Sequence, residues 1–232
     1  MMPATVGHRV LTLAVLILLA SSCGSDETSS ANTDSSNTDS SNTELSSTTA
    51  ALAVPTEPGQ QIASVTIDGD PLPAFPEGVQ ITDSSNDPAV GLVAPTLSGT
   101  NFDGSAVVVS PDGTPRVIMF VAHWCSHCQR EIPVVVDLIN EGKLPDGLEI
   151  LAVSTAVQEG QPKYPPQDWL IDENWPGPVM RDSAEFDAVR SYGAGGFPYT
   201  VYLNGENEVV ARSAGELGQD ELEQLWLATA ES

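Results

Sequence analysis

The chain has 232 residues, of which 32 are acidic and 8 are Lys or Arg, so its formal charge at neutral pH is -24. This negative charge repels phosphate backbones and anionic lipid surfaces and argues against nucleic-acid binding. The 41% hydrophobic share suits a globular protein, and three cysteines are too few for a disulfide-stapled scaffold. We expect one domain of roughly 170 residues after an apolar start of about 22 residues and a polar tract of about 39.

The N-terminus has the pattern of an export signal. His8 and Arg9 precede an apolar run over residues 10–20, which is too short to span a bilayer comfortably. The small residues 20–22 before Cys23 resemble the lipobox of bacterial lipoprotein signals. Such signals are cut at this box, and the new N-terminal cysteine is then acylated. Ala20 departs from the usual Leu of the box. We therefore predict a signal peptide over 1–22 and a lipid on Cys23. The alternative is plain secretion with a free thiol on Cys23.

A five-residue unit repeats behind Cys23, at 32–36 and 37–41 and in part at 42–44. No face of such a Ser/Thr/Asn/Asp segment can bury apolar area, so folding would not offset its ordering entropy. We predict a disordered tether up to residue 62 and a folded domain over 63–232.

Residues 63 to 115 contain short β-branched or alternating runs. Val65-Thr66-Ile67 and residues 106–109 have the composition of strands, and Asp68-Gly69 and Asp112-Gly113 are typical turn dipeptides. We expect hairpin strands that form an N-terminal β extension of the domain.

The next segments predict the centre of the domain. Residues 116–122 form a continuous apolar run after Arg116, as in a strand that is covered on both faces. From residue 126 to about 141 apolar residues recur at helical spacing with Pro133 inside the pattern, which predicts a kinked helix. Residues 148–154 predict a second buried strand.

The rest of the chain continues the alternation of strands and helices. The expected elements are a helix at 166–172 in the proline-rich stretch 156–180, an edge strand at 179–180, a helix at 184–191, a hairpin of strands 199–203 and 208–212 around Asn204-Gly205, and an amphipathic helix at 219–229 with Leu222, Leu225 and Trp226 on one face. This order predicts an α/β fold in which a mixed sheet is flanked by helices.

Two cysteines lie where the predicted central strand passes into the predicted helix, in the sequence Cys125-Ser126-His127-Cys128. Two cysteines at this spacing in a first helical turn can close a small disulfide ring. The unpaired amide donors and the helix dipole favour a thiolate on Cys125. We therefore predict that Cys125 is the nucleophile and that Cys128, one turn deeper, resolves mixed disulfides with the partner.

Residues 120–128 (FVAHWCSHC), followed by Glu131-Ile132-Pro133, resemble the thioredoxin-like TlpA/ResA family of extracytoplasmic thiol-disulfide oxidoreductases, and the resemblance spans about 90–230. It implies a thioredoxin-like fold with a central insertion before residues 175–179. Trp124 matches the family's aromatic residue before the first cysteine. Gly196-Phe197-Pro198 resembles the loop whose cis-proline lies against the dithiol. We expect Trp124, Phe197 and Pro198 to contact the substrate.

Proton transfer from the resolving thiol needs a nearby group. Met119 lies six residues before Cys125, where many thioredoxins carry a buried Asp, so that group is absent here. Glu131, three residues past Cys128, matches a glutamate that ResA-like proteins place beside their dithiol. It could relay the proton, with a pKa raised by partial desolvation. The alternative is a solvated acid that stabilises the helix N-terminus.

His127 bears on the redox potential. An imidazole immediately before Cys128 can donate to the Cys125 thiolate, or attract it when charged. Stabilising the reduced form makes the disulfide a stronger oxidant. Similar X-His dipeptides occur in oxidising DsbA-like and disulfide-isomerase-like sites, so we predict a dithiol more oxidising than that of thioredoxin. The alternative is a surface histidine with little effect.

Two other classes of protein remain open. A metal carrier, such as a copper carrier, would use the His and Cys residues at 123–128, but these four lie within six residues and the chain has no second ligand pair. A binding lipoprotein would use Cys125 and Cys128 as a structural disulfide, which would close almost no loop and so stabilise little. We expect no metal and no cofactor besides the redox-active Cys125–Cys128 disulfide.

These features together predict an enzyme held by the lipid on Cys23 at the extracytoplasmic face of the cell membrane, or secreted if that lipid is absent. The expected partners are protein thiols and disulfides, together with a membrane or extracytoplasmic redox partner, and not nucleic acid. Six acidic residues and Arg9 precede residue 63, so 26 acidic and 7 basic residues remain in the domain. We expect the resulting net charge of about -19 to keep the domain soluble rather than to select basic clients.

Overall fold

The computed structural model describes residues 60–82 and 86–232. Its elements, in chain order, are β1 (Thr66–Asp68), β2 (Thr96–Thr100), β3 (Ala106–Val109), β4 (Arg116–Val121), α1 (Ser126–Asn140), β5 (Glu149–Ser154), α2 (Pro166–Asp172), β6 (Val179–Arg181), α3 (Asp187–Ser191), β7 (Tyr199–Leu203), β8 (Val209–Ala214) and α4 (Gln219–Ala230). Five strands form the main sheet in the order β6-β5-β4-β7-β8, and β1, β2 and β3 form a second sheet. This is the expected α/β, thioredoxin-like fold with an N-terminal β extension.

β4 is the central strand because both of its faces are buried. It pairs in parallel with β5 and antiparallel with β7, and all six of its residues are buried. Successive side chains of a strand point to opposite faces. Val117, Met119 and Val121 therefore pack into one hydrophobic core, and Ile118 and Phe120 pack into the other.

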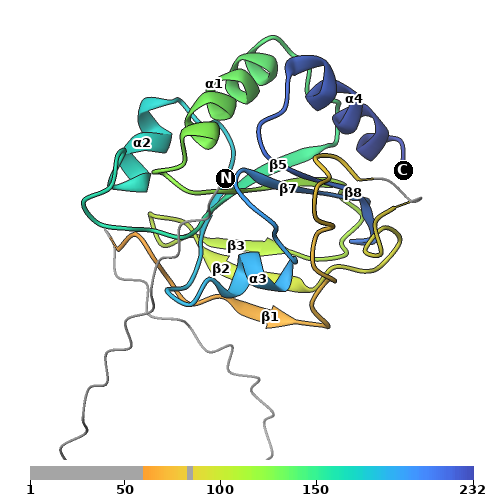
Figure 1. Cartoon of the computed structure of the whole chain (residues 1–232), viewed down its shortest axis with the longest axis horizontal. Coiled ribbons are helices and arrows are strands. Elements are labelled where there is room, and N and C mark those ends of the chain that lie inside the picture. Colours follow the sequence, from red (N-terminus) through yellow and green to blue (C-terminus); the bar gives the residue numbers. More distant parts are fainter. Residues whose placement is uncertain (1–59, 83–85) are drawn as a thin grey trace, which may run out of the picture. The chain divides into compact units, whose positions relative to one another are not determined.

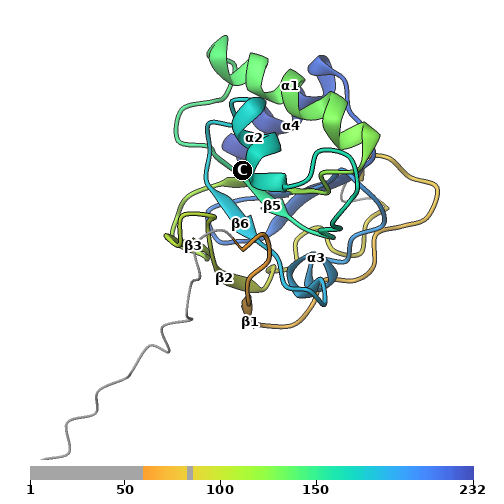
Figure 2. The same ribbon diagram turned by 90° about the vertical axis from the view of Figure 1, so that its left-hand side faces the viewer.

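The two cores lie on opposite faces of the main sheet. α1, α2 and α4 cover one face, and α3 with the three-stranded sheet covers the other (Figures 1 and 2). The first core includes Ile132 of α1 and Trp226 of α4, and the second includes Val109 of β3 and Val189 of α3. The predicted mixed sheet with covered faces is thus confirmed.

Most of the expected elements are confirmed to within a residue or two, including the edge position of β6 and the β7–β8 hairpin. α1 is one continuous helix through Pro133, which has no N–H to donate to the preceding turn. The helix expected at 184–191 begins only at Asp187. Phe186 has a left-handed backbone with φ of 64°, and the Ser183 hydroxyl accepts a hydrogen bond from the Asp187 N–H at 3.0 Å.

The N-terminal extension contains a strand, β2, that the sequence analysis did not single out. β1 and β3 do not pair with each other, because β2 lies between them and pairs antiparallel with both. The hairpin of this sheet is β2–β3, whose turn contains Asp103, and the carboxylate of Asp103 accepts the Ser105 N–H at 2.9 Å. After Asp68-Gly69, the described residues before β2 contact the end of α3, the loop that follows it, and β8. Leu72 N–H donates to Ser191 O, Phe75 N–H donates to Gly193 O, and Gly91 N–H donates to Val209 O.

The described chain starts at Gln60, three residues before the expected start of the domain. Its carbonyl accepts a hydrogen bond of 2.9 Å from the Arg181 guanidinium. The predicted signal peptide, Cys23 and nearly all of the predicted tether lie outside the described residues. Within the described ranges, no helix is long and apolar enough to cross a membrane.

Candidate active site

Cys125 and Cys128 lie at the junction of β4 and α1, where the sequence places them. Cys125 is the N-cap residue of α1 with an extended backbone, and Cys128 lies in the first turn of the helix. Both are free thiols. Cys125 is 8% exposed and Cys128 is completely buried, so a partner sulfur can approach Cys125 first.

The loop before β7 lies against the first cysteine. The Phe197–Pro198 peptide bond is cis, as the resemblance implies, and the Cys125 thiol donates to the carbonyl oxygen of Phe197 at 3.5 Å. The Trp124 and Phe197 rings meet edge to face at 6.2 Å, and the Trp124 indole N–H donates to Ala156 O at 2.7 Å. The structure therefore brings Trp124, Phe197 and Pro198 together around Cys125.

Glu131 lies on the buried side of α1 and is only 1% exposed, so it is not the solvated acid that was the alternative interpretation. One carboxylate oxygen accepts the Leu217 N–H at 3.0 Å. Burial, together with the charges of Glu216 and Glu221, raises the pKa of Glu131 to about 8 despite this hydrogen bond. The charge of Glu131 in turn acts on the thiol of Cys128.

Burial raises the pKa of the Cys128 thiol well above its ordinary value, and the neighbouring Cys125 and Glu131 add to the increase. A buried thiol of this kind is a poor nucleophile until a base removes its proton. Besides Cys125, Glu131 is the ionisable group whose charge acts on this thiol.

His127 is exposed and turned toward a pair of charged residues. Its Nδ1 atom lies 3.0 Å from a carboxylate oxygen of Glu216 and 2.8 Å from a guanidinium nitrogen of Arg130. Arg130 also donates to Glu216 through Nε at 2.9 Å. The hydrogen-bond partners of His127 are therefore these two residues rather than the sulfur of Cys125, so any effect of His127 on the thiolate acts through space.

His123 is not placed as a metal ligand would be, because both of its ring nitrogens are hydrogen-bonded to backbone groups. It is 1% exposed, its Nδ1 lies 2.8 Å from Pro162 O, and its Nε2 accepts the Gln158 N–H at 3.1 Å. These partners assign a neutral ring with the proton on Nδ1. Both ring nitrogens thus hold the loop between β5 and α2. Across the described residues, no three His, Cys, Asp or Glu side chains form a group that could hold a metal.

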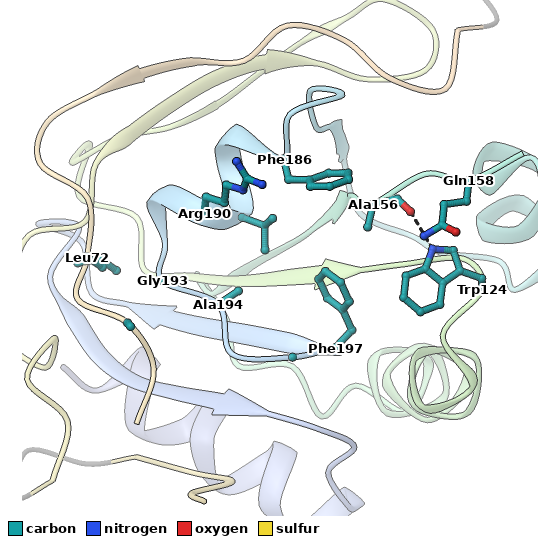
Figure 3. Close-up of a pocket in the computed structure, with 12 residues that line it drawn as sticks. Leu72, Trp124, Ala156, Gln158, Phe186, Arg190, Gly193, Ala194 and Phe197 are labelled. Atoms are coloured by element: carbon teal, nitrogen blue, oxygen red, sulfur yellow. Dashed lines mark hydrogen bonds between the residues drawn. The ribbon is translucent and has the colours of Figure 1, made fainter. Parts of the chain in front are cut away.

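A hollow of about 630 Å³ is lined in part by Trp124, which precedes Cys125 in the chain, and by Phe197, whose carbonyl oxygen accepts a hydrogen bond from the Cys125 thiol. Trp124 and Leu72 lie at opposite ends of it, with Phe197, Phe186 and Arg190 between them (Figure 3). Its walls come from the loops after β4 and β5, from α3 with the loop before β7, and from the segment before β2, so the hollow joins parts of the chain that are far apart in the sequence. Sequence analysis identified Trp124 and Phe197 but not the other three residues.

Sequence analysis also missed Arg130 and Glu216. Arg130 could have been found, because residues three apart on a helix are neighbours and Arg130 follows His127 at that spacing. Glu216 lies 86 positions from Arg130 and comes to it only through the fold.

The fold and the dithiol at the start of α1 define a thioredoxin-like protein. A family model described as "AhpC/TSA family" matches residues 86–212, which is more than half of the chain, and the chain belongs to that family. The thiol-disulfide oxidoreductase ResA of Geobacillus kaustophilus (strain HTA426) is 27% identical over 137 residues, which are 59% of this chain and 75% of that protein. By this homology the chain is a thiol-disulfide oxidoreductase of the ResA type.

Two solved structures extend the comparison. A secreted thiol-disulfide isomerase of Corynebacterium glutamicum is 16% identical and matches 71% of this chain and 100% of its own, with a TM-score of 0.54. The thioredoxin domain of a thiol-disulfide oxidoreductase from Bacteroides vulgatus is 26% identical over 59% of this chain and 94% of its own, with a TM-score of 0.48. The first of these supports the thioredoxin-like fold.

Proposed function

We propose that this protein exchanges disulfides with protein clients outside the cytoplasm, with Cys125 as the attacking cysteine and Cys128 as the resolving one. The observation that carries the proposal is the unequal placement of the two thiols. Cys125 is 8% exposed and its thiol donates to the cis-proline loop, next to residues that line the hollow, whereas Cys128 is completely buried and Glu131 acts on its thiol. A structural disulfide has no need of this difference.

In the first step, the Cys125 thiolate attacks one sulfur of a client disulfide. A bond forms between Cys125 Sγ and that sulfur, and the client's other sulfur leaves as a thiolate that takes a proton from water. Trp124, Phe197 and Pro198 hold the client backbone beside the new bond. The client is then covalently attached to Cys125.

In the second step, Glu131 acts in its ionised form, which is the minor form at neutral pH because its pKa is about 8; it takes the proton of Cys128, and Cys128 attacks Cys125 Sγ. The Cys125–client bond breaks, the client leaves as a thiolate, and the Cys125–Cys128 disulfide forms. Two electrons have then passed from the enzyme to the client. Oxidation of a client dithiol is the reverse sequence, in which Glu131 returns the proton to Cys128.

We place the dithiol on the oxidising side of thioredoxin, because Arg130 puts positive charge near the Cys125 thiolate, and His127, when charged, adds to it; this charge stabilises the reduced form. The Glu216 carboxylate binds both side chains and offsets part of that charge. The direction of exchange in the cell then depends on the potentials of the partners.

We further propose that the signal over 1–22 exports the chain and that a lipid on Cys23 anchors it, with residues 24–62 as a spacer. The export-type run, the small residues before Cys23 and the repeated polar unit support this arrangement. Without the lipid, the same enzyme is secreted.

The test of function is the Cys128→Ala variant. Without the resolving thiol, exchange stops halfway, and clients accumulate as mixed disulfides on Cys125 that diagonal gels reveal. The control is Cys128→Ala combined with Cys125→Ala, which should trap nothing. Absence of trapped clients would favour a structural disulfide, and stoichiometric Cu or Zn in the reduced protein, lost on oxidation, would favour a metal carrier.

A further inference from the structure

One basic residue at the hollow differs from the other basic residues in the described part of the chain. Five of these residues pair with carboxylates, namely Arg116, Arg130, Lys143, Lys163 and Arg212. Arg181 is buried and donates to Thr100 and Gln60. Arg190 is exposed, and within the described residues its contact is the Phe186 ring, 5.7 Å from the guanidinium carbon.

From this contrast we infer that the hollow receives a client segment that carries an apolar side chain and, close to it, a carboxylate that pairs with Arg190. The inference rests on the proposed function, because the client cysteine bound to Cys125 is what brings the segment to the hollow. It specifies the kind of polypeptide that the enzyme prefers.

The apolar part of the inference follows from the walls of the hollow. Trp124 and Phe197 lie next to the reacting sulfur, and Leu72 and Phe186 continue the apolar surface away from it (Figure 3). A volume of about 630 Å³ lies within the range of sites that hold small ligands, so it accepts a large aliphatic or aromatic side chain together with its backbone. Burial of such a side chain removes apolar area from water and therefore favours binding.

The acidic part of the inference follows from Arg190. A guanidinium that stacks on an aromatic face still directs the N–H donors of its edge outward, and these match a carboxylate in geometry. The domain as a whole is acidic, so its long-range field repels an acidic client. At physiological salt this field is screened beyond about 8 Å, whereas a direct pair with Arg190 is not. Arg190 can therefore select a carboxylate that the rest of the surface would reject.

The test measures how fast peptides attach to Cys125 in full-length protein that carries Cys128→Ala. Three peptides have a leucine beside their cysteine and differ at one nearby position, which is Glu, Gln or Lys, and each is activated as a 2-thiopyridyl disulfide. Attack by Cys125 forms the peptide–Cys125 disulfide and releases thiopyridone, whose absorbance gives the rate. A fourth peptide replaces the leucine with serine and keeps the Glu.

We expect the Glu peptide to react about two to five times faster than the Gln peptide, as an exposed ion pair would allow. Arg190→Gln should abolish this ratio, and Arg190→Glu should reverse it in favour of the Lys peptide. The matched control is Lys143→Gln, which removes a positive charge just beyond the far end of α1 and should keep the wild-type ratio. The serine peptide should react more slowly than its leucine counterpart.

Two results would overturn the inference and leave the proposed function standing. They are an unchanged Glu-to-Gln ratio in Arg190→Gln, or an equal loss of that ratio in Lys143→Gln. If no peptide attaches to Cys125 in any variant, the proposed function fails and the inference fails with it.

Discussion

Glu131 is the buried carboxyl group on which the proposed resolving step depends. Its pKa of about 8 has a consequence for stability, because an unfolded glutamate titrates near 4.5. Between these pH values the unfolded chain releases the proton and the folded chain keeps it. The folded state is therefore destabilised as pH rises from about 4.5 to about 8, by at most about 1.4 kcal/mol for each pH unit.

We predict that Glu131→Gln removes this part of the pH dependence, because glutamine does not titrate and still offers an oxygen to the Leu217 N–H. The measurement is urea unfolding from pH 4.5 to 9 in proteins that carry Cys125→Ser and Cys128→Ser, so that the thiols do not contribute. Glu185→Gln, which removes an exposed carboxylate, is the control. Parallel pH profiles for Glu131→Gln and its parent would show that Glu131 is not held in a state with a raised pKa.

A second prediction at the residue scale concerns the effect of His127 on the reduction potential of the dithiol. Proline is tolerated in the first helical turn, so His127→Pro should fold. It removes a hydrogen-bond donor and a potential positive charge near the Cys125 thiolate, and the reduction potential should fall by about 30 mV for each tenfold loss of thiolate stabilisation. Equilibration against glutathione gives the potential. An unchanged or higher potential would remove the argument for an oxidising site and favour reduction of partner disulfides.

Glu216→Gln should change the reduction potential in the opposite direction from His127→Pro. It removes the carboxylate that binds His127 and Arg130 but leaves both basic side chains in place. The uncompensated positive charge should stabilise the thiolate and raise the reduction potential. A fall in potential would mean that Glu216 acts mainly by positioning His127.

At the scale of elements, the loop between α3 and β7 determines where Phe197 and Pro198 lie. Gly193 begins this loop with φ of +73°, and a Cβ atom there would lie 2.3 Å from the carbonyl oxygen of Pro73. Only glycine fits this position without strain. The contact ties the loop to the segment before β2, which also supplies Leu72 to the hollow.

We predict that Gly193→Ala destabilises the protein by roughly 2–4 kcal/mol, because it combines a left-handed backbone with a clash against a carbonyl group. Gly196→Ala in the same loop meets open space at an ordinary φ and should change stability by no more than about 0.5 kcal/mol. Urea midpoints at constant m-value measure both. Similar losses in the two variants would contradict this account of the loop.

At the scale of the whole molecule, one buried ion pair joins the N-terminal extension to the main sheet. Arg212 of β8 and Asp87 are both completely buried, and the guanidinium binds both carboxylate oxygens, with Nε 2.8 Å from one of them. Arg212 also donates to Pro73 O at 2.8 Å. The Arg212 side chain therefore contacts the segment before β2 at both Pro73 and Asp87.

Asp87→Ala should cost about 3–5 kcal/mol of stability, since it leaves the guanidinium of Arg212 buried without its counter-ion. The control is Asp112→Ala, which removes the exposed partner of Arg116 and should cost at most about 1 kcal/mol. Glu149 and the Ser110 carbonyl still hold Arg116 in that variant. Denaturant unfolding compares the two, and equal costs would show that the Asp87–Arg212 pair does not fasten the extension.

The predicted lipid anchor on Cys23 also concerns the whole chain. If Cys23 is the acylation site, Cys23→Ala should abolish metabolic lipid labelling and release the protein from the membrane fraction. The Cys125→Ala variant keeps Cys23 and serves as the control. A lipid label that persists in Cys23→Ala, or that never appears in the wild type, would leave secretion as the interpretation.

Some features of this protein follow from the sequence alone, because they depend on neighbours along the chain. The run 116–122 is apolar at every position after Arg116, which is typical of a strand covered on both faces, and β4 is such a strand. The spacing of Cys125 and Cys128 at the end of this run places them at the N-terminus of α1. The Asn204-Gly205 dipeptide likewise predicts the β7–β8 hairpin through local backbone preference.

Other features depended on contacts between residues far apart, and periodicity carries no information about those. The position of β2 between β1 and β3 is set by the path of some 27 residues, not by the turn at Asp68-Gly69. The spacing of Glu131 along α1 allowed either a buried or a solvated carboxyl group. Burial followed from the packing of residues 217–226 over that face of the helix, and this packing is also what raises the pKa of Glu131.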